Sequence, residues 1–342
     1  MRETLSFMPL TASQTTPQTS WQQELAKACR QLPELLNYLE LDLKQISVNP
    51  QVTTKFPLHV TYAYLSRIEK GNPNDPLLRQ ILPMDDELVF HPGYTTNPVG
   101  DLEAGQTPGL LHKYHGRLLL ITTGGCSINC RYCFRREYPY NGNQTSKSVE
   151  QAAINYIKQR PEISEVILSG GDPLILSDAR LSSMVAKLEE IPHLKRLRIH
   201  TRLPVTLPSR VDSPLLKWLS RTRLTTSIVL HVNHPNELDG AVSEALLLLR
   251  QTGVILLNQS VLLKGINDSE LTLCELSESL FQNGVLPYYL HLLDKVSGSQ
   301  HFDLPEADAR LLYHKIRSKL PGYLVPTLVR ERSGFPYKSP VL

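Results

Sequence analysis

From residue 117 onward, apolar runs alternate with amphipathic stretches, and this alternation limits the possible folds more than any other feature of the sequence. The apolar runs rich in β-branched residues predict strands at Leu118–Thr123, Glu165–Ser169, Arg196–Thr201, Thr225–Val232, Val254–Val261 and Val285–Leu292. Ranges with helical periodicity follow them near 149–159, 178–190, 212–221, 236–252, 269–283 and 305–319. Because strands and helices alternate, we expect a parallel sheet with right-handed crossovers that is buried on both faces.

The predicted fold is α/β, a partial and open (β/α)6 TIM-like barrel with an N-terminal helical extension. A last strand-like segment, Tyr323–Val329, is expected at the open edge of the barrel. Helical periodicity over 20–42, which Pro33 interrupts, predicts either a kinked helix or two short helices, and 57–70 predicts another helix. The predicted organisation is an accessory segment at 1–107 and a barrel with a C-terminal segment at 108–342.

The length, charge and hydropathy of the chain do not favour a nucleic-acid-binding, membrane or secreted protein. The chain of 342 residues can bury a sizeable core. Its 36 Lys and Arg against 33 Asp and Glu give a net charge of +3, which does not indicate a nucleic-acid surface. No apolar stretch reaches the roughly 20 residues that a membrane helix requires, and the N-terminus lacks the pattern of a secretory signal. We therefore expect a cytoplasmic protein with no nucleic acid and no membrane among its partners.

Three of the five cysteines lie close together after the first predicted barrel strand, at Cys126, Cys130 and Cys133. The C-x3-C-x2-C spacing provides three thiolates, which favour a [4Fe-4S] cluster with one iron open for chemistry. Structural zinc usually takes four ligands in paired spacing, and the sequence has no second pair, so a zinc site completed by His115 is the weaker alternative. Cys29 and Cys274 are isolated and are interpreted as structural.

Polar residues also follow the later predicted strands. They are Ser169 to Pro173, His200 to Arg202, His231 with Asn233 and His234, Asn258 to Ser260, and His291 to Asp294. In parallel α/β barrels, the reacting groups gather on the loops at the carboxyl ends of the strands. The cysteines and these polar residues are therefore predicted to line one site.

The motifs in these positions resemble those of radical S-adenosylmethionine (SAM) enzymes, and within that superfamily those of lysine 2,3-aminomutases. The similar motifs lie at 108–115, 130–136, 169–174, 198–204, 233–237 and 258–268, and the resemblance covers roughly 55–342. Residues 71–80 and 288–296 resemble the short bacterial branch in particular, which supplies (R)-β-lysine for modification of translation elongation factor P.

This resemblance implies an isomerase that converts L-α-lysine to (R)-β-lysine by 2,3-migration of the amino group. The implied cofactors are the [4Fe-4S] cluster, SAM as the source of a 5′-deoxyadenosyl radical, and pyridoxal 5′-phosphate (PLP) as the relay for the amino group. The implied partners are L-lysine, a flavodoxin- or ferredoxin-type electron donor and, downstream, a β-lysyl ligase and elongation factor P. A homo-oligomer stays open. The alternative is a radical SAM enzyme without PLP, or an aminomutase for another amino acid.

The resemblance also assigns roles to residues that would bind cofactors. The cluster ligands would be Cys126, Cys130 and Cys133. Contacts to SAM would come from Ser169, Gly170, Gly171, Asp172 and His231, and further polar contacts to the cofactors from Asn258 and Gln259. Lys338 would hold PLP as a Schiff base, with Lys113 and Arg117 at its phosphate. Ser269 stands where the longer enzymes have a zinc-binding cysteine, and their C-terminal extension is absent, so we expect no zinc.

For the substrate, the resemblance assigns one cation and two acids. Arg135 would bind the carboxylate of lysine, and Asp294 and Glu331 would bind its distal ammonium. Three positions differ from the longer enzymes: Glu331 replaces an aspartate, Lys113 replaces a guanidinium, and the loop before Lys338 keeps only one glycine.

Overall fold

The sheet of this protein is built mainly from parallel strands in sequence order. The structure, a computed structural model, describes residues 20–48, 50–141 and 146–341. Ten strands form one sheet in the order β1 to β10. They are β1 (Gly105–Thr107), β2 (Leu110–Tyr114), β3 (Arg117–Thr123), β4 (Glu165–Gly170), β5 (Arg196–His200), β6 (Thr225–Leu230), β7 (Ile255–Val261), β8 (Leu286–His291), β9 (Thr327–Arg330) and β10 (Ser339–Pro340).

Strands β3 to β9 are all parallel, and each pairs with the next. The edge strands β1, β2 and β10 are antiparallel to their neighbours. In the described residues, β1 and β10 do not pair with each other, so the barrel is open. These pairings confirm the predicted partial barrel, and β9 overlaps the segment predicted at its open edge.

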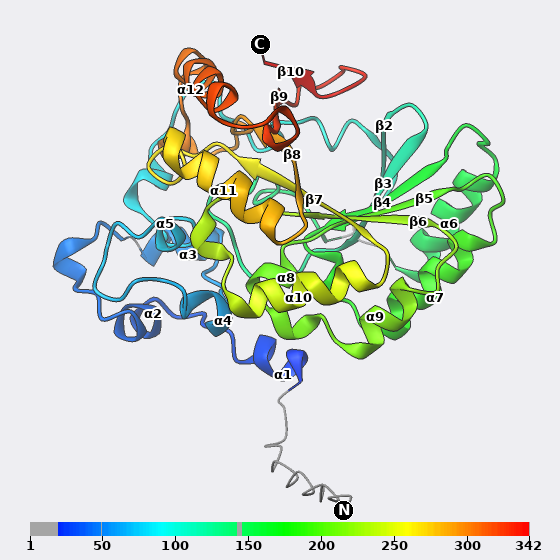
Figure 1. Ribbon diagram of the computed structural model, residues 1–342, viewed down its shortest axis with the longest axis horizontal. Coiled ribbons are helices and arrows are strands. Elements are labelled where there is room, and N and C mark those ends of the chain that lie inside the picture. Colours follow the sequence, from blue (N-terminus) through cyan, green and yellow to red (C-terminus); the bar gives the residue numbers. More distant parts are fainter. Residues whose placement is uncertain (1–19, 49, 142–145, 342) are drawn as a thin grey trace, which may run out of the picture.

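The helices between the parallel strands cover the sheet (Figure 1). They are α6 (Lys147–Lys158), α7 (Asp178–Glu189), α9 (Ser213–Leu219), α10 (Gly240–Gln251) and α11 (Glu270–Gln282), and α12 (Glu306–Lys319) follows β8. The first five begin after a Ser or Asp whose side chain accepts a backbone hydrogen bond in the first turn. A short helix, α8 (Leu203–Thr206), which the sequence pattern did not predict, follows β5.

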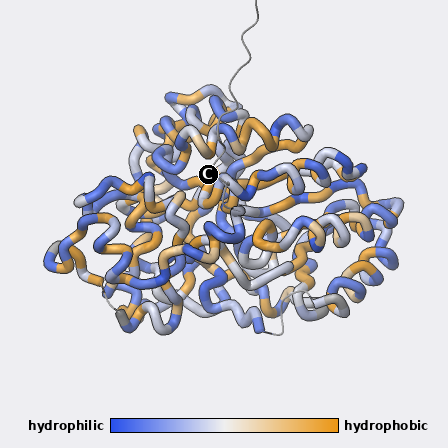
Figure 2. The backbone as a smooth tube through the Cα atoms, turned by 90° about the horizontal axis from the view of Figure 1, so that it is seen from below, coloured by the Kyte–Doolittle hydropathy of each residue, from blue (hydrophilic) through white to orange (hydrophobic). Residues whose placement is uncertain are grey.

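The main apolar core lies between the sheet and these helices. Leu120, Leu168 and Ile199 from the strands are fully buried with Leu188 and Leu246 from the helices. Along the elements, apolar and hydrophilic residues alternate, as Figure 2 shows for the backbone. In the described ranges, no helix is long and apolar enough to span a membrane.

The N-terminal segment forms a second, smaller apolar cluster. The helices of the N-terminal segment are α1 (Trp21–Ala26), α2 (Leu32–Tyr38), α3 (Pro50–Lys55), α4 (Tyr62–Leu65) and α5 (Pro76–Arg79). The periodic stretch at 20–42 thus forms two short helices, with Pro33 in the first turn of the second. Leu35, Leu65 and Leu78 pack in this cluster with Ile128, which belongs to the cysteine loop. The N-terminal segment therefore supports the loop that carries the cysteines.

One local prediction for this region was wrong, and one hairpin was missed. The helix predicted over 57–70 has only four residues, because Val60 pairs with Cys29 in a bridge and the Thr61 side chain caps the helix that follows. The β1–β2 hairpin was not predicted, since the polar residues His112 and Lys113 interrupt the apolar pattern of β2. The predicted boundary between 107 and 108 falls in the turn of this hairpin, and the division into 1–107 and 108–342 stays a prediction.

Candidate active site

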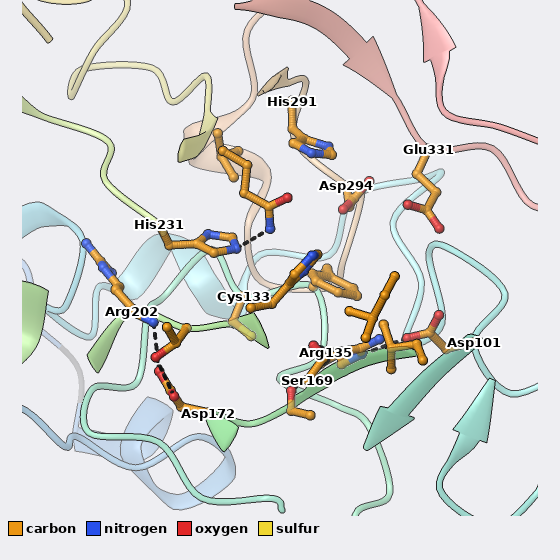
Figure 3. Close-up of a pocket in the computed structure, with 18 of the residues that line it drawn as sticks. Asp101, Cys133, Arg135, Ser169, Asp172, Arg202, His231, His291, Asp294 and Glu331 are labelled. Carbon is orange, nitrogen blue, oxygen red and sulfur yellow. Dashed lines mark hydrogen bonds and ion pairs between the residues drawn. The ribbon is translucent and has the colours of Figure 1, made fainter. Parts of the chain in front are cut away.

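A cavity of ≈ 250 Å³ lies inside the barrel and is lined from every parallel strand or from the loop after it (Figure 3). Nearly all residues predicted for the site line this cavity: Cys126, Cys130, Cys133, Lys113, Arg117, Arg135, Ser169, Gly170, Gly171, Asp172, His231, Gln259, Asp294, Glu331 and Lys338. The structure brings them together, and their individual roles stay predictions.

The cavity is not lined by Asn233, His234 or Ser260, which were predicted to lie at the site, nor by Asn258, which was predicted to contact the cofactors. The side chain of Asn258 exchanges hydrogen bonds with the backbone of Val232, 2.9 Å and 3.1 Å long, and donates to Ser260 at 2.9 Å. Successive side chains of a strand point to opposite faces, so Asn258 and Gln259 of β7 cannot both face the barrel interior. Gln259 does face it, and its amide contacts the ring of His231.

The three cysteines lie on a loop that is fixed at several points. The backbone N–H of Asn129 donates to the carbonyl of His59 at 2.8 Å, and that of Arg131 donates to the carbonyl of Gln80 at 2.9 Å. Arg202, at the end of β5, donates from Nη1 to Cys130 Sγ at 2.8 Å. Cys29, by contrast, is buried in the N-terminal cluster, as its structural interpretation predicts.

The surroundings of the cysteines fit an iron–sulfur cluster. Burial raises the pKa of Cys126 well above that of a free thiol and raises the pKa of Cys133 to about 11. Ionising these thiols therefore requires a nearby positive charge, which bound iron supplies. Within the described ranges, no three His, Cys, Asp or Glu side chains are grouped to hold a single metal ion. A cubane cluster does not need such a group, because each thiolate binds a different iron.

The glycines at the end of β4, Gly170 and Gly171, allow this strand to approach the cysteine loop closely. Gly170 has φ +128°, and a Cβ atom there would overlap the carbonyl oxygen of Thr123. A Cβ atom on Gly171 would overlap the carbonyl oxygen of Gly125, immediately before the first cysteine. Only glycine fits at these two positions without moving the backbone of the loop.

Asp172, which follows these glycines, is engaged within the protein. Its carboxylate accepts hydrogen bonds from Thr201 Oγ1 at 2.7 Å and from the backbone N–H groups of Leu174, Arg202 and Leu203 at 3.0, 2.7 and 3.1 Å. A carboxylate has about four acceptor sites, and all are used here. Asp172 therefore ties the end of β4 to the end of β5, and its predicted contact with SAM competes with these four bonds.

At another side of the cavity, Lys338 precedes β10 and forms an ion pair with Glu331. Burial alone would raise the pKa of Glu331, but Lys338 and Lys113 lower it to about 2. Lys113 Nζ contacts Glu331 at 3.1 Å, Asp101 at 2.5 Å and the carbonyl oxygen of Val99 at 2.7 Å. An ammonium has three hydrogens to donate, and these three acceptors use them.

Arg135 and Asp294 are the other charged residues predicted to bind substrate. Arg135 donates from Nε to Asp101 at 2.7 Å and from Nη1 to Ser169 Oγ at 3.2 Å. Asp294 has no ion-pair partner in the part of the chain that the structure describes. Burial and the charge of Glu331 raise its pKa to about 7. Figure 3 shows Asp294, Glu331 and Asp101 on the same side of the cavity.

Other polar residues of the cavity had no individual role in the prediction, and they include Asp101, Arg198, His200, Arg202, Tyr289 and His291. His200, Arg202 and His291 lie at or just after strand ends, and this position is the feature of the sequence that predicts them at the site. Burial lowers the pKa of His200 and His291, and the Nε2 atom of each is buried without a partner in the described residues. Asp101 lies in the loop before β1, outside the motifs that carry the resemblance.

Comparison with known proteins agrees with this geometry. The Radical SAM superfamily profile matches residues 120–276. L-lysine 2,3-aminomutase of Escherichia coli (strain K12) is 46% identical over 328 residues, which cover 96% of each chain. The protein of the same name from Haemophilus influenzae is 46% identical over 320 residues, 94% of this chain and 95% of that protein. The one from Clostridium subterminale is 35% identical over 324 residues, 94% of this chain and 77% of that protein.

Among solved structures, a radical SAM methyltransferase from Sphaerobacter thermophilus aligns with a TM-score of 0.46 and 17% identity, over 66% of this chain and 69% of that chain. This likeness is too distant to bear on function. The identity to the bacterial aminomutases, however, extends over nearly the full length of both chains, and the superfamily match includes the cysteine loop. This chain therefore belongs to the lysine 2,3-aminomutase family of the radical SAM superfamily.

Proposed function

We propose that this protein is an L-lysine 2,3-aminomutase, an isomerase that moves the α-amino group of L-lysine to C3 and yields (R)-β-lysine. One observation carries the proposal: a single cavity is lined by the three cysteines, by Lys338, and by separate cationic and acidic side chains that suit the two ends of a diamino acid. The relatives named L-lysine 2,3-aminomutase support the same activity.

Membership of the radical SAM superfamily implies a [4Fe-4S] cluster and SAM. When bound, they supply a 5′-deoxyadenosyl radical, which can take a hydrogen atom from an unactivated carbon. Cys126, Cys130 and Cys133 would hold the cluster. The three thiols are partly buried and line the cavity, a position that would limit the access of water to the radical.

The residues around Lys338 suit PLP. When bound, PLP supplies a conjugated ring through which an amino group can migrate between neighbouring carbons. Lys338 would carry it, and Arg117 is the better candidate for its phosphate. The Arg117 guanidinium lies 4.7 Å from the ring centroid of Tyr114 and donates no hydrogen bond to the described residues, whereas Lys113 has no hydrogen left to donate.

Substrate binding would use charges at separate points of the cavity. Arg135, buried and held by Asp101, would bind the carboxylate, and Asp294 would accept the distal ammonium with Glu331 beside it. Asp294 gains its counter-cation only when lysine enters. A substrate without a distal ammonium leaves this buried acid unpaired, which favours lysine over amino acids with neutral side chains.

The direct test is anaerobic incubation of the reconstituted protein with L-lysine, SAM, PLP and dithionite, followed by chiral chromatography. We expect (R)-β-lysine from the wild type and none from Lys338→Ala. Rearrangement of glutamate or another amino acid in place of lysine would overturn the substrate assignment. Full activity of Lys338→Ala without added PLP would favour the alternative, a radical SAM enzyme that does not use PLP.

We also propose a cytoplasmic location, where thiolates stay reduced. There the product would pass to a β-lysyl ligase and to elongation factor P, and the electron would come from a flavodoxin- or ferredoxin-type donor. Deletion of the gene should remove β-lysine from elongation factor P, as mass spectrometry of the purified factor would detect. Unchanged modification would rule out this use of the product. The absence of zinc stays a prediction, and the oligomeric state stays open.

A further inference from the structure

Five charged side chains of alternating sign form a continuous chain along the cavity wall. The order is Lys338, Glu331, Lys113, Asp101 and Arg135, and each contacts the next. The chain begins at the lysine proposed to carry the cofactor and ends at the arginine proposed to bind the substrate carboxylate. Asp101 is its fourth member, and no role was predicted for it from the sequence.

Asp101 uses both of its carboxylate oxygens within this chain. Oδ1 contacts Lys113 Nζ at 2.5 Å, and Oδ2 accepts from Arg135 Nε at 2.7 Å. The side chain of Asp101 is only 4% exposed and that of Arg135 only 7%. The remaining contacts of the guanidinium are weaker, a 3.2 Å bond to Ser169 Oγ and a 3.5 Å bond to the carbonyl of Gly170, both from Nη1. Asp101 is therefore the residue that fixes the orientation of Arg135.

This orientation leaves one nitrogen of Arg135 available. Nε is used by Asp101 and Nη1 by Ser169, whereas Nη2 donates no hydrogen bond to any described residue. The side chain lines the cavity. A planar guanidinium held at one edge presents its other nitrogens in a fixed direction, which lowers the entropy lost when a carboxylate binds.

We infer that Asp101 is a positioning residue that fixes Arg135 for the substrate carboxylate, and that Lys113 is the cation that joins Asp101 to Glu331 rather than a contact to the cofactor phosphate. Without Lys113, two buried carboxylates would each lose a cation, so both ends of the substrate site depend on it. The inference rests on the proposed function, because it concerns binding of L-lysine in this cavity.

The test compares Asp101→Asn with Asp178→Asn in the reconstituted holoenzyme. Asp178 accepts from the fully buried Arg210 at 2.9 Å, so its variant also loses an Asp–Arg ion pair, but outside the cavity. We expect Asp101→Asn to raise KM for L-lysine about ten- to hundredfold, as for loss of a hydrogen bond between charged groups, with a smaller change in kcat. Asp178→Asn should leave KM unchanged.

1,5-Diaminopentane is lysine without its carboxylate. Its inhibition constant Ki therefore distinguishes a loss of the orientation of Arg135 from a general disturbance of the cavity. Its Ki should stay unchanged in Asp101→Asn and rise in Lys113→Met, because the second variant also disturbs Glu331. An unchanged KM, or an equal loss of affinity for L-lysine and the diamine in Asp101→Asn, would overturn the role of Asp101. A higher Kd for PLP with an unchanged Ki in Lys113→Met would assign Lys113 to the phosphate instead.

Two further measurements cover a variant that does not fold and distinguish failure of the Asp101 role from failure of the proposed function. If Asp101→Asn does not fold, as judged by its melting curve, Asp101→Glu moves the carboxylate by one methylene while keeping the charge, and should raise KM for L-lysine selectively. Calorimetric binding of L-lysine to the wild type distinguishes the two levels of failure. If the wild type neither binds nor rearranges L-lysine, the proposed function is wrong, whereas normal binding by both proteins refutes only the role of Asp101.

Discussion

Two thiols of the cysteine loop, those of Cys126 and Cys133, lie where burial makes them difficult to ionise without a positive partner. Burial raises the pKa of both Cys126 and Cys133, while Cys130 receives a hydrogen bond from Arg202. In the proposed site the three thiolates are the protein ligands of the cluster, so the site has no spare cysteine. The isolated Cys274 lies at the edge of another apolar cluster and is not part of the cavity.

We expect Cys133→Ala to lose the cluster and all aminomutase activity. The measurements are iron and acid-labile sulfide per chain after anaerobic reconstitution, together with the visible absorbance of the cluster. Cys274→Ala is the control and should retain both. A Cys133→Ala protein with the iron content and activity of the wild type would refute the three-thiolate site.

Asp294 gives the substrate site a pH dependence. Burial and the neighbouring Glu331 raise its pKa to about 7, so the carboxyl is mostly neutral at pH 6 and mostly ionised at pH 8. The distal ammonium of lysine stays protonated over this range. If the ionised form of Asp294 binds it, kcat/KM should rise about tenfold from pH 6 to pH 8. Asp294→Asn should lower kcat/KM and remove this rise. A flat wild-type profile would contradict this role.

At the scale of elements, the turn after β4 determines how closely two strands meet. The backbone of Gly171 lies against that of Gly125, so a side chain on Gly171 would push the cysteine loop outward. We expect Gly171→Ala to reduce both the iron content and the affinity for SAM, measured by reconstitution and by equilibrium dialysis. Gly240→Ala is the matched control, because a Cβ atom at this first residue of α10 meets nothing within 4 Å. Equal behaviour of the two variants would show that the close contact is not needed.

The sequence predicted the elements of the barrel well, because their signals are local. The predicted range 178–190 agrees with α7, whereas the range 236–252 begins four residues before α10, because the capping residue Asp239 was not used to place its start. The β1–β2 hairpin gave no such signal. Lys113 in β2 interrupts the apolar pattern, and its position is explained only by the acids at Asp101 and Glu331, which the fold brings to it.

For the candidate site, the sequence predicted which residues lie at the cavity better than it predicted the contacts they make. Motif residues such as Arg135 and Lys338 line the cavity as the resemblance implies, since each motif follows a strand whose end faces the site. The sequence does not show which acceptors a side chain will meet. The full hydrogen-bonding of Lys113 and Asp172, and the position of Asn258 outside the cavity, result from contacts between distant segments.

At the scale of the whole molecule, the N-terminal segment and the barrel meet at the cysteine loop. Gln80 accepts from Arg202 Nη2 at 2.7 Å, and Arg202 in turn contacts Cys130. Glu87 forms ion pairs with two arginines of the loop, Arg131 and Arg136, both at 2.6 Å. The N-terminal segment thus provides the polar partners that hold the loop in place.

Glu87 is the central residue of this contact, and its side chain is only 1% exposed. Glu87→Gln keeps the size of the side chain but leaves the buried Arg131 and the nearly buried Arg136 without their counter-charge. Breaking a buried ion pair by removal of one partner typically costs about 3–5 kcal/mol. We therefore expect a loss of this order in the free energy of unfolding of the cluster-free protein, measured by anaerobic denaturant titration.

Glu40→Gln is the control, because Glu40 pairs with Lys70 on the surface, where such pairs contribute little. It should unfold as the wild type does. Because Glu87 supports the loop from outside the cavity, Glu87→Gln should also lose iron faster than the wild type during exposure to a chelator. If it matches Glu40→Gln in both stability and iron retention, the N-terminal segment does not hold the cysteine loop through this ion pair. Its effect on the site would then have to come from the apolar contacts around Ile128.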